Sequence, residues 1–403
     1  MTTSSEASHP CPGSPPEQRS SHMPPTHIGL ITTLNRNIGD DFIRDGIVQL
    51  MLQVFAGRDV RFVAVNKHTP WSVYPGWHPL RWLQTLDDVP RGRRAADWMR
   101  SNVSGALHPL GGSRFDHVDI IVQCGAPVLW PGCNGSEWAS PLWDQVVGRL
   151  SDRVPVLNLA AGSAYAWEDQ PQQVSDARDA DFLSRIMGYC KVTTARDELA
   201  SRLAGGLGVS VPTIPCSAFL VGRRFGVPNR ADDGIVLFNY MPGAGHFGWR
   251  QGIDETVWME TARSLVERLS TRHRVAFICH DLKEYAAAGR VNPDLPRFMP
   301  RTPEEYFSLI HASKAAVCNR LHAAVALASV GIPSVSVGTD TRLLMVAAIG
   351  LPYRYVKDVD VDLLEDAIEA LLEHRNDERD RLLELREWTW SRYIDEVARV
   401  VAA

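Results

Sequence analysis

The chain has 403 residues and a formal net charge of −5, with 45% hydrophobic and 22% charged residues. This length suits one large domain or two domains with substantial cores, and the slightly acidic balance argues against nucleic-acid binding as the main task. The seven cysteines are an odd number and form no CxxC pair, which argues against a disulfide framework and against a structural metal site.

The first 26 residues are rich in Ser and Pro and contain no apolar run. We expect residues 1–26 to form a disordered tail, because they bury too little apolar surface to offset the entropy lost on ordering. They also lack the apolar segment of a secretory signal. No later stretch offers the roughly 20 apolar residues of a transmembrane helix. We therefore expect a cytoplasmic protein without a transmembrane segment.

Short apolar runs alternate with amphipathic stretches along the first half of the chain. The predicted strands are 27–34, 59–65, 117–125, 154–162, 191–196 and 211–220, and the predicted helices are 41–55, 93–103, 141–150, 179–190 and 197–208. Strands that alternate with helices indicate βαβ units and a mostly parallel sheet that is covered on both faces.

A second α/β half follows a stretch with the Gly, Pro and charge of a linker, residues 222–234. Its predicted strands are 234–240, 274–281, 314–319 and 333–338, and its predicted helices are 254–271, 302–313 and 320–331, followed by two helices between 361 and 403. We predict an α/β fold of two Rossmann-like domains with parallel sheets, residues 27–222 and 232–403, closed by the C-terminal helices. Such folds bind ligands at the carboxyl ends of their strands.

A basic pair begins one of these helices, in the stretch "CNRLHAAVALASVGIP". The partial positive charge of a helix N-terminus favours anions and disfavours Arg320 and His322 at this place. The pair therefore indicates a negative ligand, which backbone N–H groups, a guanidinium fork and an imidazole would bind together. The alternative is that Arg320 pairs with a nearby Asp or Glu and that His322 is a buried polar residue.

Two further segments place polar residues directly after predicted strands. Arg196 ends a strand and precedes Asp197, a candidate N-cap, so it is either a second anion ligand or an arginine beside an ordinary cap. In "NIGDD", Gly39 permits close backbone approach, and Asp40 caps the next helix or contacts a substrate hydroxyl. A glycine turn with a cap is the plain alternative for this second segment.

With these three segments in this order, the chain resembles the polysaccharide pyruvyl transferase family. Members of that family show "NIGD" after the first strand, "RD" before a helix in mid-chain, and a late "RLH" followed by an apolar helix and "GIP". Here the three segments are Asn37–Asp40, Arg196–Asp197, and Arg320–His322 with its following Gly331–Pro333. The resemblance extends over roughly residues 28–350.

The resemblance implies a fold similar to the two-domain GT-B glycosyltransferases, with phosphoenolpyruvate as donor and a sugar diol as acceptor that becomes a pyruvate ketal. By the same resemblance Arg196, Arg320 and His322 would hold the phosphate and carboxylate of the donor. His322 would be the general acid, and Arg320 would be catalytic by stabilising the leaving phosphate. The substrate-binding candidates are Arg196, Leu321, Asn37, Gly39, Asp40 and His246. This scheme needs no metal and no cofactor, because phosphoenolpyruvate is a co-substrate.

The aromatic and Gly-rich loops beside the predicted crevice suggest where an acceptor would bind. Four tryptophans form a candidate stacking platform for a sugar: Trp130, Trp138, Trp143 and Trp167. Ordinary packing is the alternative for each of them. His246 lies in "YMPGAGHFGW", which is either a phosphate-cradling loop or a flexible one, and His280 and Asp281 end a strand at the same edge.

The chain also departs from the family pattern. Cys216 and Ser217 stand where an acidic residue is common, and Ala323 stands where glycine is common. Two rival functions therefore stay open: a GT-B nucleotide-sugar glycosyltransferase that uses the crevice for a diphosphate, and a non-catalytic relative that binds an anion without turnover. The sequence leaves the oligomeric state open as well, a homo-oligomer included.

Overall fold

The computed structural model describes residues 24–82, 107, 112–125, 127–228, 233–246 and 248–402. The predicted helix 93–103 lies outside the described residues, as do nearly all of the predicted tail and part of the predicted linker.

The first half of the chain forms a six-stranded parallel sheet with the order β2-β1-β3-β5-β4, in which β6 also pairs with β5. Its strands are β1 (Thr26–Thr32), β2 (Val60–Asn66), β3 (Ile120–Cys124), β4 (Pro127–Leu129), β5 (Val156–Ser163) and β6 (Val192–Ala195). Its helices are α1 (Ile38–Val54), α2 (Pro79–Trp82), the π-helix η4 (Ala139–Val147) with α5 (Gly148–Leu150), α6 (Ala177–Tyr189) and α7 (Glu198–Gly206).

The prediction of a strand at residues 211–220 is wrong. Thr213 makes only an isolated bridge with Ala195, and the chain then turns into the 3-10 helix η5 (Ser217–Leu220). Pro212 and Pro215 lack the backbone N–H groups that a ladder needs, so the apolar run at this place cannot continue as a strand.

The second half forms another six-stranded parallel sheet, with the order β12-β11-β10-β7-β8-β9. Its strands are β7 (Ile235–Asn239), β8 (Val275–Ile278), β9 (Arg297–Phe298), β10 (Ser313–Cys318), β11 (Ser334–Gly338) and β12 (Tyr353–Tyr355). Its helices are α9 (Glu255–Ser270), α10 (Leu282–Val291), α11 (Pro303–Ile310), α12 (Leu321–Ser329), α13 (Leu343–Ala347), α14 (Val361–Glu373) and α15 (Arg375–Val401), after the short α8 (Gly222–Phe225).

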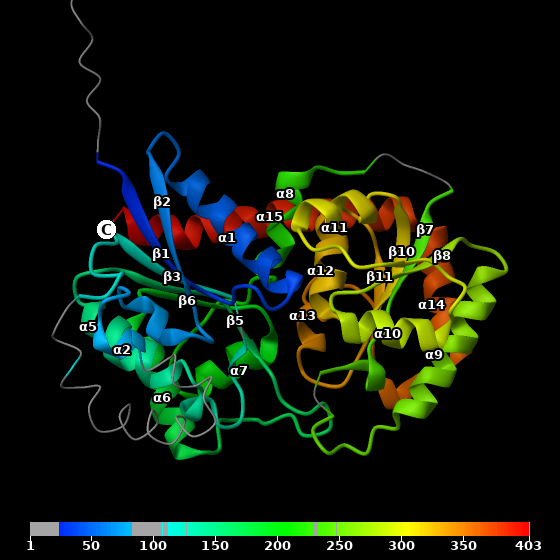
Figure 1. Cartoon of the computed structure of the whole chain (residues 1–403), viewed down its shortest axis with the longest axis horizontal. Helices are drawn as coiled ribbons and strands as arrows, with labels where there is room; N and C mark the ends of the chain where they lie inside the picture. Colours follow the sequence, from blue (N-terminus) through cyan, green and yellow to red (C-terminus); the bar gives the residue numbers. More distant parts are fainter. Residues whose placement is uncertain are drawn as a thin grey trace, which may run out of the picture.

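This order reverses direction between β7 and β10, as in a Rossmann sheet, and a reversal point of this kind leaves a crevice beyond the carboxyl ends of the two strands. The predicted fold class is therefore confirmed: two parallel-sheet α/β halves lie side by side (Figure 1).

The two halves share one apolar core. It includes Phe42 of α1, Phe219 of η5, Ala324 of α12 and Tyr393 of α15. Helix α15 starts in the second half and runs back across the first half, where it packs against α1 and β6 (Figure 1). The tyrosine hydroxyl of Tyr393 donates a hydrogen bond to the carbonyl oxygen of Pro215 at 2.9 Å. The crevice between the halves is thus held in place by burial of apolar surface on its far side.

Candidate active site

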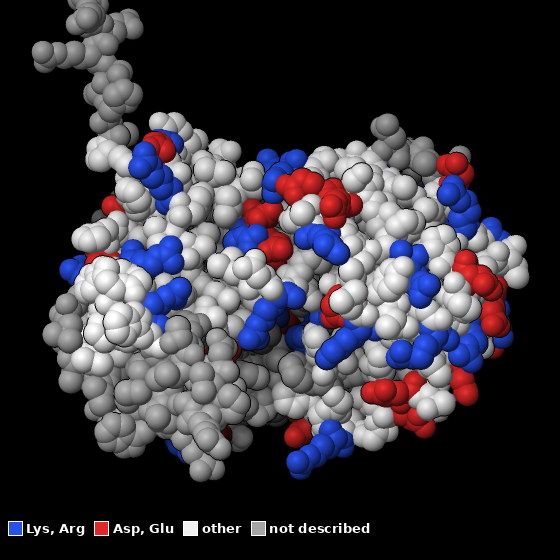
Figure 2. Space-filling view, viewed as in Figure 1, with Lys and Arg blue, Asp and Glu red and all other residues white. Residues whose placement is uncertain are grey.

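A cavity of about 340 Å³ lies between the halves, at the carboxyl ends of their strands. Its cationic side chains are Arg36, Lys67, Arg196, Arg320 and Arg342, its imidazoles are His68, His246, His280 and His322, and its carboxylates are Asp40 and Asp340. Figure 2 shows basic side chains along the boundary between the halves on the face that it draws. Positive charge thus exceeds negative charge around the cavity.

Arg196 follows β6 and is fully buried. Its backbone N–H donates to the carbonyl oxygen of Ala161 at 2.9 Å, and Asp197 caps α7 by accepting from the backbone N–H of Ala200 at 2.8 Å. The predicted cap is therefore confirmed. A Cβ atom on Gly162 would come within 2.3 Å of the Arg196 Nε, so glycine is what leaves room for the guanidinium here.

The Arg196 side chain has no ion-pair partner among the described residues, and its buried Nε and Nη2 make no hydrogen bond there. Its Nη1 lies 3.4 Å from the Nε2 of His322. Because a guanidinium can only donate, this contact requires an unprotonated Nε2 on His322. Burial lowers the pKa of His322 well below its ordinary value, and Arg196 and Arg342 lower it further. The imidazole of His322 is therefore neutral in this state.

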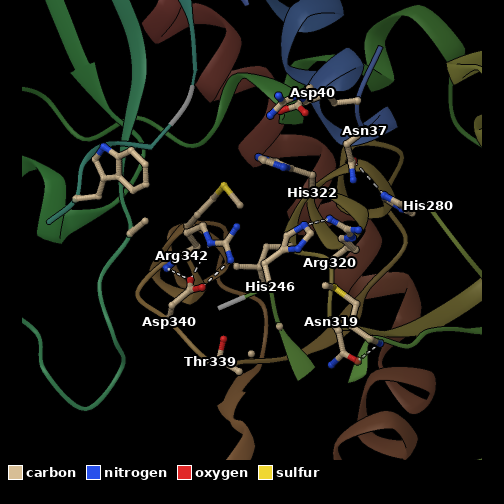
Figure 3. A pocket seen from close by; sticks show the side chains of 18 of the residues that line it. Asn37, Asp40, His246, His280, Asn319, Arg320, His322, Thr339, Asp340 and Arg342 are labelled. Carbon is tan, nitrogen blue, oxygen red and sulfur yellow. Dashed lines mark hydrogen bonds and ion pairs between the residues drawn. The ribbon is translucent and has the colours of Figure 1, made fainter. Parts of the chain in front are cut away.

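Arg320 is the N-cap residue of α12 and lies two residues after the end of β10. Its backbone N–H donates to the Oδ1 of Asn239 at 2.7 Å. Its guanidinium donates to the Nε2 of His246 (Figure 3). It also donates to Asp281 at 2.8 Å and to Glu284. The ion-pair alternative raised from the sequence therefore describes this guanidinium correctly, although the residue also lines the cavity.

The "NIGD" segment forms the first turn of α1. Asn37 caps this helix by accepting from the backbone N–H of Gly39 at 2.7 Å. The expected cap at Asp40 is wrong, because the helix begins one turn earlier than predicted and Asn37 precedes its first residue. Asp40 instead lines the cavity, where burial raises its pKa and Lys67 opposes this rise. The Nδ1 of His280 lies 3.5 Å from the Oδ1 of Asn37.

Gly39 brings α1 against α12 at the cavity. A Cβ atom on Gly39 would lie 2.9 Å from the Cβ of His322, closer than real contacts of this kind. The close backbone approach expected at Gly39 is thus an approach to His322, the second residue of the basic pair.

We expect Gly39→Ala to lower the free energy of unfolding by about 1–3 kcal/mol, because an overpacked side chain costs about this much. Gly188→Ala is the matched control: nothing lies within 4 Å of a Cβ at this helical position, so alanine should stabilise the protein by up to about 1 kcal/mol. Urea unfolding of both variants checks the pair. Equal effects of the two substitutions would contradict the contact between Gly39 and His322.

His246 and Arg342 line the cavity from two loops of the second half. Burial lowers the pKa of His246 to about 4, and the charges of Arg320 and Arg342 act in the same direction. Arg342 donates through Nε and Nη2 to the two carboxylate oxygens of Asp340, at 2.8 and 2.6 Å (Figure 3). Leu321, which the sequence proposes as a substrate-binding residue, also borders the cavity.

A family model for polysaccharide pyruvyl transferase matches residues 37–341. The chain belongs to the polysaccharide pyruvyl transferase family. The match extends over the three segments that carried the resemblance and over nearly all of the cavity lining. The comparison with curated proteins finds no match.

Solved structures with the same fold are distant in sequence. A UDP complex of MnaA from S. aureus superposes with a TM-score of 0.50 at 11% identity, covering 94% of this chain and 97% of that chain. A putative UDP-N-acetylglucosamine 2-epimerase from Listeria monocytogenes has a TM-score of 0.52 at 9% identity, covering 90% and 91%. These likenesses show the fold alone, and they agree with the GT-B-like arrangement that the family resemblance implied.

Two of the four tryptophans proposed for the acceptor border the cavity, Trp130 and Trp138. The other two do not. Trp143 is fully buried in the core of the first half, and Trp167 stacks on Tyr355 with ring centroids 6.3 Å apart. Packing therefore explains these last two.

Sequence reasoning missed Lys67, His68 and Arg342. Lys67 and His68 directly follow β2, and Arg342 lies four residues after β11. The signal that could have found them is the one used for Arg196: a basic side chain just past a strand at the ligand-binding edge.

Among the residues that the structure describes, no group of three or more His, Cys, Asp or Glu side chains is placed to hold a metal ion. None of the described helices combines the length and the apolar character that a membrane crossing needs.

Proposed function

We propose that the cavity binds phosphoenolpyruvate and that the protein transfers its pyruvyl group to a diol of a saccharide acceptor. One observation carries the proposal: Arg196 is a fully buried guanidinium without an ion-pair partner among the described residues, and it faces His322. A buried charge is costly unless a counter-charge accompanies it. An anionic donor would supply that counter-charge.

The charges around Arg196 suit an anion with two acidic groups. Arg36 and Lys67 add positive charge to the cavity wall and form no ion pair within the described part of the chain, and Arg342 adds a third cation that Asp340 partly neutralises. Phosphoenolpyruvate carries a phosphate and a carboxylate on the same carbon, C2. Guanidinium groups bind both of these groups in a bidentate manner.

The neutral imidazole of His322 fits a base better than the general acid that the resemblance implied. As one acceptor hydroxyl oxygen bonds to C2 of phosphoenolpyruvate, the electron pair of the C=C double bond takes up a proton at the methylene carbon, and the Nε2 of His322 would take the proton of the hydroxyl. The imidazolium would then give this proton to the phosphate oxygen as the C2–O bond to phosphate breaks. The arginines would stabilise the charge on the departing phosphate.

A groove of about 1040 Å³ adjoins the cavity and is the proposed acceptor site. The two hollows share Arg36, His280 and Arg320, so a molecule in the groove would reach the cavity directly. Carboxylates and cations both line the groove, Asp281 and Lys283 among them, and such groups suit the hydroxyls of a sugar.

Phosphate release tests the proposal. The protein would be incubated with phosphoenolpyruvate and a mixture of p-nitrophenyl hexosides and N-acetylhexosaminides. We expect release of inorganic phosphate together with a new ketal methyl signal in the proton NMR spectrum. His322→Asn should lower the rate by about 10²–10⁴-fold, as loss of a general base does.

The matched control for this experiment is His273→Asn. His273 bonds Glu369 and Lys314 away from the cavity, so this variant should keep the rate of wild type. Consumption of UDP-sugars in the absence of any phosphate release from phosphoenolpyruvate would contradict the proposal and favour a glycosyltransferase. Full activity of His322→Asn would remove His322 from the mechanism.

A further inference from the structure

Lys67 is a buried lysine whose ammonium has no carboxylate within ion-pair distance in the described part of the chain. The residue is 8% exposed and borders the cavity. Its backbone N–H donates to the carbonyl oxygen of Thr32 at 2.8 Å, which fixes the residue at the end of β2. Its Nζ lies 5.9 Å from the ring centroid of Trp138, a weak substitute for a counter-ion.

The free-energy cost of burying an ammonium group is larger than the stabilisation from one aromatic contact. A functional role would explain why a lysine is buried at this place. The other charged groups that face it come from several elements. Asp40 lies on α1, Arg36 precedes this helix, Arg196 follows β6, and Glu137 lies before η4. Burial lowers the pKa of Lys67 to about 8, while Asp40 opposes the shift and Arg196 adds to it.

Ketal formation needs a proton donor at the methylene carbon of phosphoenolpyruvate in addition to a base for the hydroxyl. The four cavity imidazoles are poor candidates. Burial lowers the pKa of each of them, and nearby arginines add to this effect: His68, His246, His280 and His322. Guanidinium groups hold their protons too firmly to donate them. An ammonium that titrates near neutral pH suits the task.

We propose that Lys67 is the residue that gives a proton to the methylene carbon of phosphoenolpyruvate and recovers one when the ketal closes. This inference rests on the proposed function.

One N–H bond of the Lys67 ammonium breaks, and the electron pair of the C=C double bond forms the new C–H bond, which leaves C2 electron-deficient. The first acceptor hydroxyl bonds to C2 and loses its proton to His322, which passes it to the departing phosphate. The second hydroxyl then bonds to C2 and returns a proton to the Lys67 amine. One diol proton thus ends on phosphate, and the other replaces the lysine proton that went to the methyl group.

The test compares Lys67→Arg with Lys67→Met in the full-length protein. Calorimetric titration measures the affinity for phosphoenolpyruvate, and phosphate release with the hexoside mixture measures turnover. We expect Lys67→Arg to bind phosphoenolpyruvate within about threefold of wild type, because the charge is kept. Turnover of both variants should fall by about 10²-fold or more, because neither side chain donates a proton. Lys191→Arg should match wild type, because Lys191 lies one residue before β6 and outside the cavity.

The pH profile separates proton transfer from simple attraction. Wild-type turnover should fall as the pH rises above about 8, because the ammonium loses its proton there, and this fall should be absent from the residual rate of Lys67→Arg. Lys67→Arg turnover within threefold of wild type would overturn the proposal for Lys67 and leave the proposed function standing. Failure of wild type to bind phosphoenolpyruvate would overturn the proposed function itself, and the role of Lys67 with it.

Discussion

Arg196→Met should strongly weaken binding of phosphoenolpyruvate without lowering the stability of the protein. The affinity should fall by about 100-fold or more, since a charge-assisted bond to a buried ligand is worth about 3 kcal/mol. The free energy of unfolding should stay the same or rise by about 1–3 kcal/mol, because the substitution removes buried Nε and Nη2 groups that have no partner. Thermal unfolding and calorimetric titration measure the two quantities.

Arg386 offers a matched control for this prediction. It is also a buried arginine, but its Nη1 donates to the carbonyl oxygen of Ser329 at 2.7 Å and its Nε donates to Glu387 at 3.1 Å, away from the cavity. Arg386→Met should therefore lower stability and leave the affinity for phosphoenolpyruvate unchanged. A loss of stability in Arg196→Met as large as in Arg386→Met would show that Arg196 is a structural residue.

Arg320→Met should destabilise the protein by about 3–5 kcal/mol, the usual effect of removing one partner of a buried ion pair. Glu284 is 2% exposed and would be left as a buried carboxylate. Burial raises the pKa of Glu284, and Arg320 is the main group that opposes this rise. The difference in the free energy of unfolding between wild type and the variant should therefore become smaller as the pH is lowered. At low pH the folded variant takes up a proton at Glu284, which removes the buried charge. Urea unfolding at several pH values checks this.

A second variant separates stability from function at Arg320. In the double variant Arg320→Met/Glu284→Gln the carboxylate charge is gone, so part of the lost stability should return. Phosphate release should stay low, because the guanidinium at the cavity wall is still missing. Recovery of turnover together with stability would mean that Arg320 acts only by positioning α12 and α10.

The family resemblance implied that Arg196 and His322 meet at one donor, although they lie 126 positions apart. Each follows a strand, and the carboxyl ends of parallel strands point toward the same crevice. The partners of Arg320 could not be named in this way. Glu284 reaches it from α10, and which carboxylate meets a guanidinium depends on how helices pack and on side-chain rotamers.

Predictions from local sequence patterns were wrong where one stretch carried the patterns of two different structures. Both Asn37 and Asp40 belong to residue types that cap helices, and only the structure shows that the helix starts at Ile38. The run before Leu220 is apolar enough for a strand, but two prolines limit its pairing to one isolated bridge. Lys67 was not predicted as a site residue, because it lies one residue after β2, where polar residues are common at the end of a strand.

The most direct test of the central claim is a calorimetric titration of the wild-type protein with phosphoenolpyruvate, beside titrations with inorganic phosphate and UDP-N-acetylglucosamine. The proposal predicts one site per chain for phosphoenolpyruvate, with tighter binding than for phosphate alone because the carboxylate adds a second anchor. Binding of the nucleotide sugar without binding of phosphoenolpyruvate would contradict the claim.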